Sequence, residues 1–194
     1  MTFEDATPLE DPTPLEAPHG LDDHRGGLGV DHFIGDLVFG ANDGLITTFA
    51  IVSSVAGAEL GSTAALVLGL ANLLGDGVSM AAGNYLGRRS DTQVAAVRAG
   101  RIAARRGPIT HGAAMFAAFV VAGAVPLLPY LVLDAGMAFA LALFATAVTL
   151  FGVGSARTLV TRQPWLGAGI EMLGVGSLAA ILAFGVGWLF RSVV

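Results

Sequence analysis

Four acidic side chains lie inside long apolar stretches of the sequence, where ionisable groups are rare. They are Asp36, Asp43, Asp76 and Glu171. A charge at the centre of a bilayer costs about 2.5–3.5 kcal/mol even on lenient scales, so such a group usually marks an ion pathway or a buried pair. We expect no arginine or lysine inside these stretches to pair with them. An ion pathway is therefore favoured, and a protonated, hydrogen-bonded structural acid is the alternative.

The spacing of these residues places several of them on two helix faces. Asn72, Asp76, Met80 and Asn84 recur every four residues, and Asp36, Gly40, Asp43 and Thr47 form a similar face on the preceding stretch. Asp43 lies about 10 residues, or ~15 Å, from the end of its helix. In an antiparallel pair this depth is level with the gap between Met80 and Asp76.

Carboxylates facing a thioether would suit a cation of intermediate softness. Carboxylates alone favour magnesium or calcium, and a methionine sulfur shifts the preference toward iron(II) and its neighbours. Met80 is equally compatible with plain packing. Glu171 is a weaker candidate for a second polar contact. His19, His24 and His32 belong more readily to a solvated tail than to a metal site, and we expect His111 at the membrane interface.

The elements that must position these residues are membrane-spanning helices. Of 194 residues, 54% are hydrophobic, mean hydropathy is +0.72, and cysteine is absent. Apolar runs of about 20 residues are long enough to cross a bilayer. Five runs of this kind occur at about 33–57, 62–87, 109–131, 135–157 and 165–190. We therefore predict an all-α, polytopic membrane protein with a five-helix transmembrane domain over residues 32–194.

The charges predict the orientation of this domain. Residues 1–31 hold eight acids and one arginine, with four prolines, and we expect a disordered cytoplasmic tail. With the N-terminus inside, nine of ten arginines fall on the cytoplasmic side and only Arg191 falls outside. The C-terminus is then extracytoplasmic. Residues 88–107 are expected to form a basic loop that contacts lipid headgroups, with an amphipathic surface helix as one possible form.

A ladder of small residues lies beside the polar stripe of the second run. Its members are Gly75, Ser79, Gly83 and Gly87. Such ladders allow helix backbones to approach closely. We expect this one to pack helices within a protomer or between two protomers.

Three stretches resemble the vacuolar iron transporter (VIT) family. Residues 39–45 (FGANDGL) are similar to its first-helix signature, residues 77–86 (GVSMAAGNYL) to its second-helix pattern, and residues 169–174 (GIEMLG) to its last helix. The resemblance implies a five-helix protomer that dimerises around a metal path, with Asp43 and Met80 at path positions. Many members carry Glu where this chain has Asn72. Plant-type members insert an acidic metal-capture domain where this chain has its basic loop.

From these observations we expect a proton-coupled exporter of iron(II), and of manganese(II), in a bacterial-type inner membrane. The predicted metal-path residues are Asp43, Met80, Asp76, Asp36, Asn72 and Glu171. The expected partners are membrane lipids, divalent metal ions, protons and a second copy of the chain, with no nucleic acid and no tightly bound cofactor. A carrier of another divalent metal or solute and a non-transporting membrane scaffold are the alternatives. An enzyme is not expected.

Overall fold

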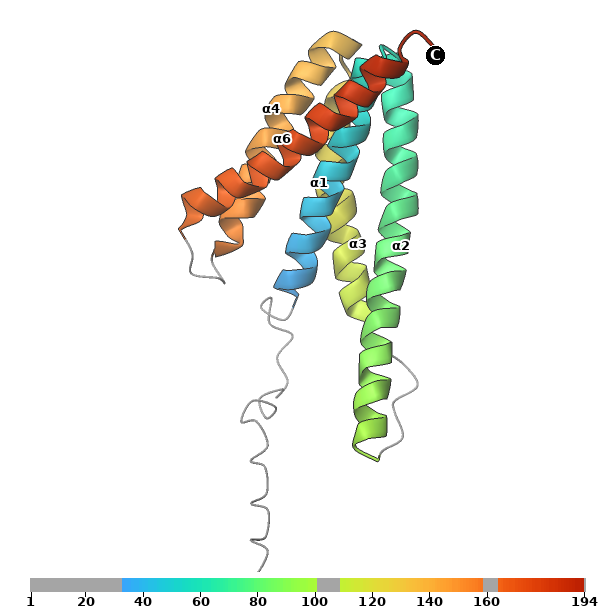
Figure 1. Ribbon diagram of the computed structural model, residues 1–194, viewed down its shortest axis with the longest axis vertical. Coiled ribbons are helices and arrows are strands. Elements are labelled where there is room, and N and C mark those ends of the chain that lie inside the picture. Colours follow the sequence, from blue (N-terminus) through green and yellow to red (C-terminus); the bar gives the residue numbers. More distant parts are fainter. Residues whose placement is uncertain (1–32, 101–108, 159–163, 194) are drawn as a thin grey trace, which may run out of the picture.

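The computed structural model describes residues 33–100, 109–158 and 164–193. The predicted tail with His19 and His24 lies outside the described residues, as do His32, Arg101, Arg105, Arg106 and Arg162. The described chain is helical throughout its spans (Figure 1). The helices are α1 (Ile34–Gly57), α2 (Gly61–Arg98), α3 (Ile109–Ala124), the 3₁₀ helix η2 (Val125–Leu131), α4 (Ala135–Ala156) and α6 (Trp165–Phe190).

Five segments of the described chain are long and apolar enough to cross a membrane: α1, α2, α3 together with η2, α4 and α6. The five predicted runs agree with these segments to within one residue at every boundary but one. The all-α fold class and the number of spans are therefore confirmed. The third segment changes to a 3₁₀ helix at Val125, where Pro126 and Pro129 remove backbone N–H donors.

The exception is the end of the second span. We predicted its end at residue 87, but α2 continues without a break through Arg98 and projects beyond the ends of its neighbours (Figure 1). No proline or glycine interrupts residues 88–98, so the polar sequence extends the same helix. The described part of the basic segment is thus a straight continuation of α2 rather than a separate surface helix.

Helix α1 is the centre of the bundle. It lies between α2 and the α4–α6 pair, and it also packs against α3 (Figure 1). Glycines allow this close packing: a Cβ atom on Gly40 would lie 2.5 Å from the Met115 carbonyl oxygen, and one on Gly44 would collide with the Phe119 backbone. Contacts of this kind fix α1 and α3 against each other, backbone to backbone.

The small-residue ladder of α2 does not take part in this packing. An added Cβ on Gly75, Gly83 or Gly87 would meet no described atom within 4 Å, and Ser79 is exposed. Packing of the ladder within the described protomer is therefore not observed. The ladder instead forms an open, narrow strip on the outer surface of α2.

Candidate functional site

The candidate site lies along the contact between α1 and α2, which we call the α1–α2 seam. It comprises Asp36, Asp43 and Thr47 from α1 and Asn72, Asp76, Met80, Asn84 and Arg88 from α2. One end of the seam is tied by hydrogen bonds: the Thr47 hydroxyl donates to the Asp43 carbonyl oxygen at 2.7 Å, and the Asn72 amide approaches the Thr47 hydroxyl at 3.5 Å. The two helices are therefore antiparallel, as predicted, and Thr47 lies at the level of Asn72.

Asp43 and Asp76 occupy the middle of the seam. Both side chains are half-buried, and their carboxylates are close enough to interact electrostatically. In the described part of the chain, neither carboxylate forms an ion pair with a basic side chain. Two facing carboxylates without a cation repel each other, so a proton or a metal ion between them would be stabilised.

Met80 follows Asp76 by one helical turn and is also half-buried. It packs against the apolar core cluster that contains Phe49 and Phe119. Its packing role is thus observed, and a role of its sulfur as a metal ligand stays a prediction. The side-chain oxygen of Asn42, beside Asp43, is buried and has no hydrogen-bond partner among the described residues. This acceptor is not among the predicted site residues.

Asp36, at the other end of the seam, is in a different environment. Its carboxylate is 5% exposed and is bound from three sides. The Arg88 guanidinium lies 3.1 Å away, the Asn84 amide donates at 2.8 Å, and His111 Nδ1 of α3 lies 2.5 Å from Oδ2. We call these four residues the Asp36 cluster. It joins α1, α2 and α3 at the end of the bundle from which α2 projects.

One expectation is corrected by these contacts. Arginines do pair with the acids, because Arg88 binds Asp36 and Arg157 binds Glu171 at 3.3 Å. His111 is 2% exposed and packs against the Phe33 ring, 4.7 Å between centroids, and its place at the membrane interface stays a prediction. Arg88 was missed because it follows the predicted end of the span. It nevertheless continues the four-residue spacing of Asn72, Asp76, Met80 and Asn84.

Glu171 does not reach the seam. Its side chain is 66% exposed on α6 and faces Arg157 at the end of α4. No group of three or more His, Cys, Asp or Glu side chains that could hold a metal occurs within residues 33–100, 109–158 and 164–193. One described protomer therefore brings together a carboxylate pair with neighbouring amide and thioether groups, and their role as metal ligands stays a prediction.

Comparison with known proteins gives independent evidence about the family of this chain. A sequence model of the VIT family matches residues 34–105 and 95–188. The chain is 26% identical over 217 residues to a protein named vacuolar iron transporter 2 from Oryza sativa subsp. japonica, with 81% of this chain and 87% of the relative covered.

Two protozoan proteins named vacuolar iron transporter match over shorter stretches. The one from Toxoplasma gondii is 44% identical over 54 residues, and the one from Plasmodium falciparum is 37% identical over 68 residues. These stretches cover 28% and 34% of this chain, and only 18% and 25% of the relatives' own lengths.

Proposed function

The chain belongs to the VIT family, and on that premise we propose that it carries iron(II), and secondarily manganese(II), across a membrane in exchange for protons. The observation that carries this proposal is the Asp43–Asp76 pair, two half-buried carboxylates on neighbouring helices that are close enough to interact electrostatically, with no basic partner among the described side chains. The relatives' names describe transporters, which supports a carrier rather than an enzyme.

In the proposed mechanism the carboxylate pair binds either protons or one divalent cation. Asp43 is the main ligand and proton acceptor, and Asp76 takes the place of the Glu that many members carry at the Asn72 position. Metal binding requires deprotonated ligands, so each bound cation releases protons from the pair. Met80 adds a soft ligand that favours iron(II), and Asn72 adds an amide oxygen. Asp36 holds the helices in register.

A second copy of the chain would complete the ligand set. Mostly oxygen-bound divalent cations favour about six ligands, and one protomer offers fewer. A two-fold dimer is the commonest closed assembly, and the exposed strip of Gly75, Ser79, Gly83 and Gly87 is narrow enough for close helix contact. Native mass spectrometry in mild detergent should detect dimers in the wild type and fewer in Gly83→Leu. Monomers alone in the wild type would contradict this assembly.

The proposed orientation has the N-terminus in the cytoplasm of a bacterial cell and the C-terminus outside the inner membrane. Its support is the concentration of arginines at the projecting end of α2 and in the α4–α6 connection. Reporter fusions after Val194 and within residues 90–105 test it. A C-terminal fusion that is active only in the cytoplasm would contradict the proposal.

Flux measurements in proteoliposomes test the function itself. The full chain should accumulate iron(II) and manganese(II) faster than cobalt(II) and zinc(II) under a pH gradient, and Asp43→Asn should remove this flux. Asp91→Asn is the matched control, because Asp91 is an exposed acid on the projecting part of α2. Native flux in Asp43→Asn would favour a structural acid, and a chain without metal flux would favour the scaffold alternative.

A further inference from the structure

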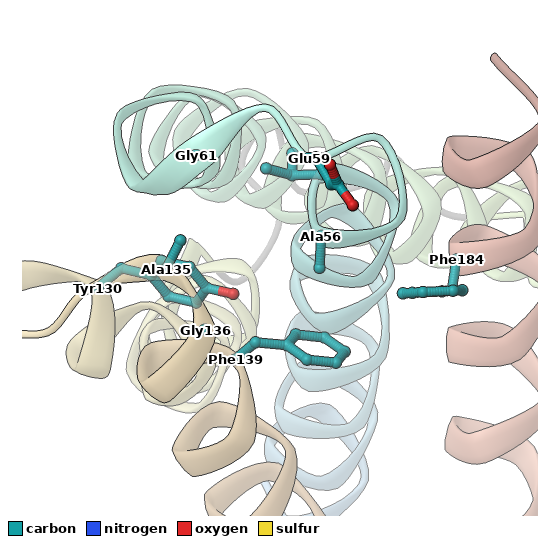
Figure 2. Close-up of a pocket in the computed structure, with 9 residues that line it drawn as sticks. Ala56, Glu59, Gly61, Tyr130, Ala135, Gly136, Phe139 and Phe184 are labelled. Carbon is teal, nitrogen blue, oxygen red and sulfur yellow. The ribbon is translucent and has the colours of Figure 1, made fainter. Parts of the chain in front are cut away.

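A cavity of about 280 Å³ lies at the end of the bundle opposite the Asp36 cluster (Figure 2). It is bounded by the end of α1, the start of α2, η2, the start of α4 and α6. Its walls are mostly apolar, with Val55, Phe139 and Phe184 contributing the largest side chains. Because all five spans begin or end here, the cavity lies where hydrocarbon meets the lipid headgroups.

One polar group is buried in this apolar wall. Tyr130 is 5% exposed, and its hydroxyl has no hydrogen-bond partner among the described residues. In Figure 2 the hydroxyl oxygen points into the space between Ala56, Gly136 and Phe139. Buried hydroxyl groups normally have a hydrogen-bond partner. The cavity therefore presents one unused donor deep inside, which requires an acceptor on whatever fills it.

Glu59 is the charged residue among the described lining residues, and it brings a cationic partner close to the cavity although that partner does not line it. Glu59 forms an ion pair with Arg191 at 2.8 Å, and both side chains are more than half exposed. Glu59 has a φ of 56° and is the single non-glycine residue with positive φ in the described chain. A large side chain in this conformation is uncommon. The short turn between α1 and α2 thus holds a carboxylate at the mouth of the cavity despite a backbone penalty.

These features together match one class of ligand. We propose that the cavity binds a zwitterionic phospholipid with an ethanolamine headgroup. The ammonium group lies at the Glu59 carboxylate, the phosphate lies at the Arg191 guanidinium, and part of an acyl chain fills the space beside Phe139 and Phe184. The Tyr130 hydroxyl donates its hydrogen bond to an ester carbonyl of the same lipid.

The charges and the cavity disfavour other occupants. A divalent metal would find Glu59 as the sole carboxylate among the described lining residues. An anionic lipid would place its phosphate at Arg191 but leave Glu59 without a cationic partner, and a soluble amine would leave the apolar walls empty. The proposal does not depend on transport, since no residue of the seam lines the cavity.

Native mass spectrometry of the delipidated full chain tests this site. We expect phosphatidylethanolamine to bind more tightly than phosphatidylglycerol with the same acyl chains. Tyr130→Phe should weaken binding about 2- to 10-fold, the range of one hydrogen bond. Glu59→Gln should weaken it about 2- to 5-fold and remove the preference between the two lipids. Glu171→Gln, which breaks a similar ion pair at the other end, should change neither.

A cavity-filling variant supplies an independent measurement. Gly136 lines the cavity, and an added Cβ there meets nothing within 4 Å, so Gly136→Leu should fold and abolish binding. Gly152→Leu is the control on the same helix, equally open and away from the cavity. Unchanged binding in Gly136→Leu or Tyr130→Phe would overturn the proposal. Competition by free phosphoethanolamine, which has no acyl chains, would also overturn it in favour of a soluble ligand.

Discussion

The two acids of α1 that lie in the α1–α2 seam occupy contrasting environments. Asp36 and Asp43 are separated by seven residues, or about two helical turns, and both face α2. Asp36 is enclosed by Arg88, Asn84 and His111, whereas Asp43 lies near a second carboxylate and forms no ion pair within the described part of the chain. The same residue type on the same helix face therefore takes part in a satisfied polar cluster at one end and in a repulsive pair in the middle.

This difference shows how one end of the seam can fix the contact between two helices while its middle can attract a proton or a metal ion. A buried carboxylate that is fully hydrogen-bonded stabilises the contact between helices, and exchange of its partners would be unfavourable. A carboxylate pair without a cation is stabilised when a proton or a metal ion binds to it. The Asp36 cluster sets the register of α1 against α2, and that register keeps Asp43 opposite Asp76.

The largest effect is expected from Asp43→Asn. Transport should fall by at least about 10- to 100-fold, since even outer-shell changes at metal sites cost this much. Folding should survive with a small gain in stability, because a neutral amide is less costly to bury than an unpaired carboxylate. The pH dependence of any residual flux should vanish. Proteoliposome flux and thermal unfolding measure both parts, and a native rate and pH profile would contradict the proposal.

Asp76→Asn should have an intermediate effect on transport, about 10-fold. It removes the same repulsion from the other side of the seam but leaves Asp43 as a ligand. The double variant Asp43→Asn with Asp76→Asn should lose no more flux than Asp43→Asn alone, because the two groups act as one site. Independent losses that multiply would show that the carboxylates serve separate steps.

Asp36→Asn should change stability more than transport chemistry. Loss of hydrogen bonds to a charged group costs about 1–3 kcal/mol, and the expected decrease in the free energy of unfolding lies in this range. The residual flux should keep the native metal preference. Arg88→Gln should cost less, because the arginine is 40% exposed. If Asp36→Asn kept full stability but altered metal preference, Asp36 would belong to the ion path.

The smallest change is expected from Met80→Leu. The substitution conserves volume and apolarity, so its stability cost should stay below about 1.5 kcal/mol. Loss of the sulfur should shift the flux ratio of iron(II) to magnesium(II) toward magnesium(II). Competition between these two ions in proteoliposomes measures the shift. An unchanged ratio would leave Met80 as a packing residue of the core.

The fold could be predicted from the sequence because the apolar runs are uniform and clearly bounded. Hydropathy misplaces only the end of the second span, where the helix continues into polar sequence. At α2 the helix continues past residue 87 because its backbone hydrogen bonds need no apolar side chains. Pro126 and Pro129 lie near the end of the third span, and the structure adds the 3₁₀ geometry that follows from them.

The site was predicted less completely because its residues come from three helices. Their contacts depend on how those helices pack against one another. Four-residue spacing identifies the face of α2, and Arg88 continues it, so the pairing with Asp36 had a signal in the sequence. No such signal exists for His111, whose position beside Asp36 is set by the close packing of α3 on α1 through Gly40 and Gly44. Spacing within one helix carries no information about the crossing point of another.

The glycine contacts also determine which parts of the bundle can move. Helix α1 meets the backbones of two neighbours through glycine, with Gly40 and Gly44 against α3 and Gly57 against α6. Helix α2 has one such contact, at Ala81, whose carbonyl oxygen would lie 2.7 Å from a Cβ on Gly112 of α3. Helices α1, α3 and α6 are therefore held together by close backbone contacts. Among the described residues, Ala81 is the one point where the backbone of α2 meets a neighbouring glycine in this way. A cycle that opens and closes the seam should therefore pivot α2 about Ala81.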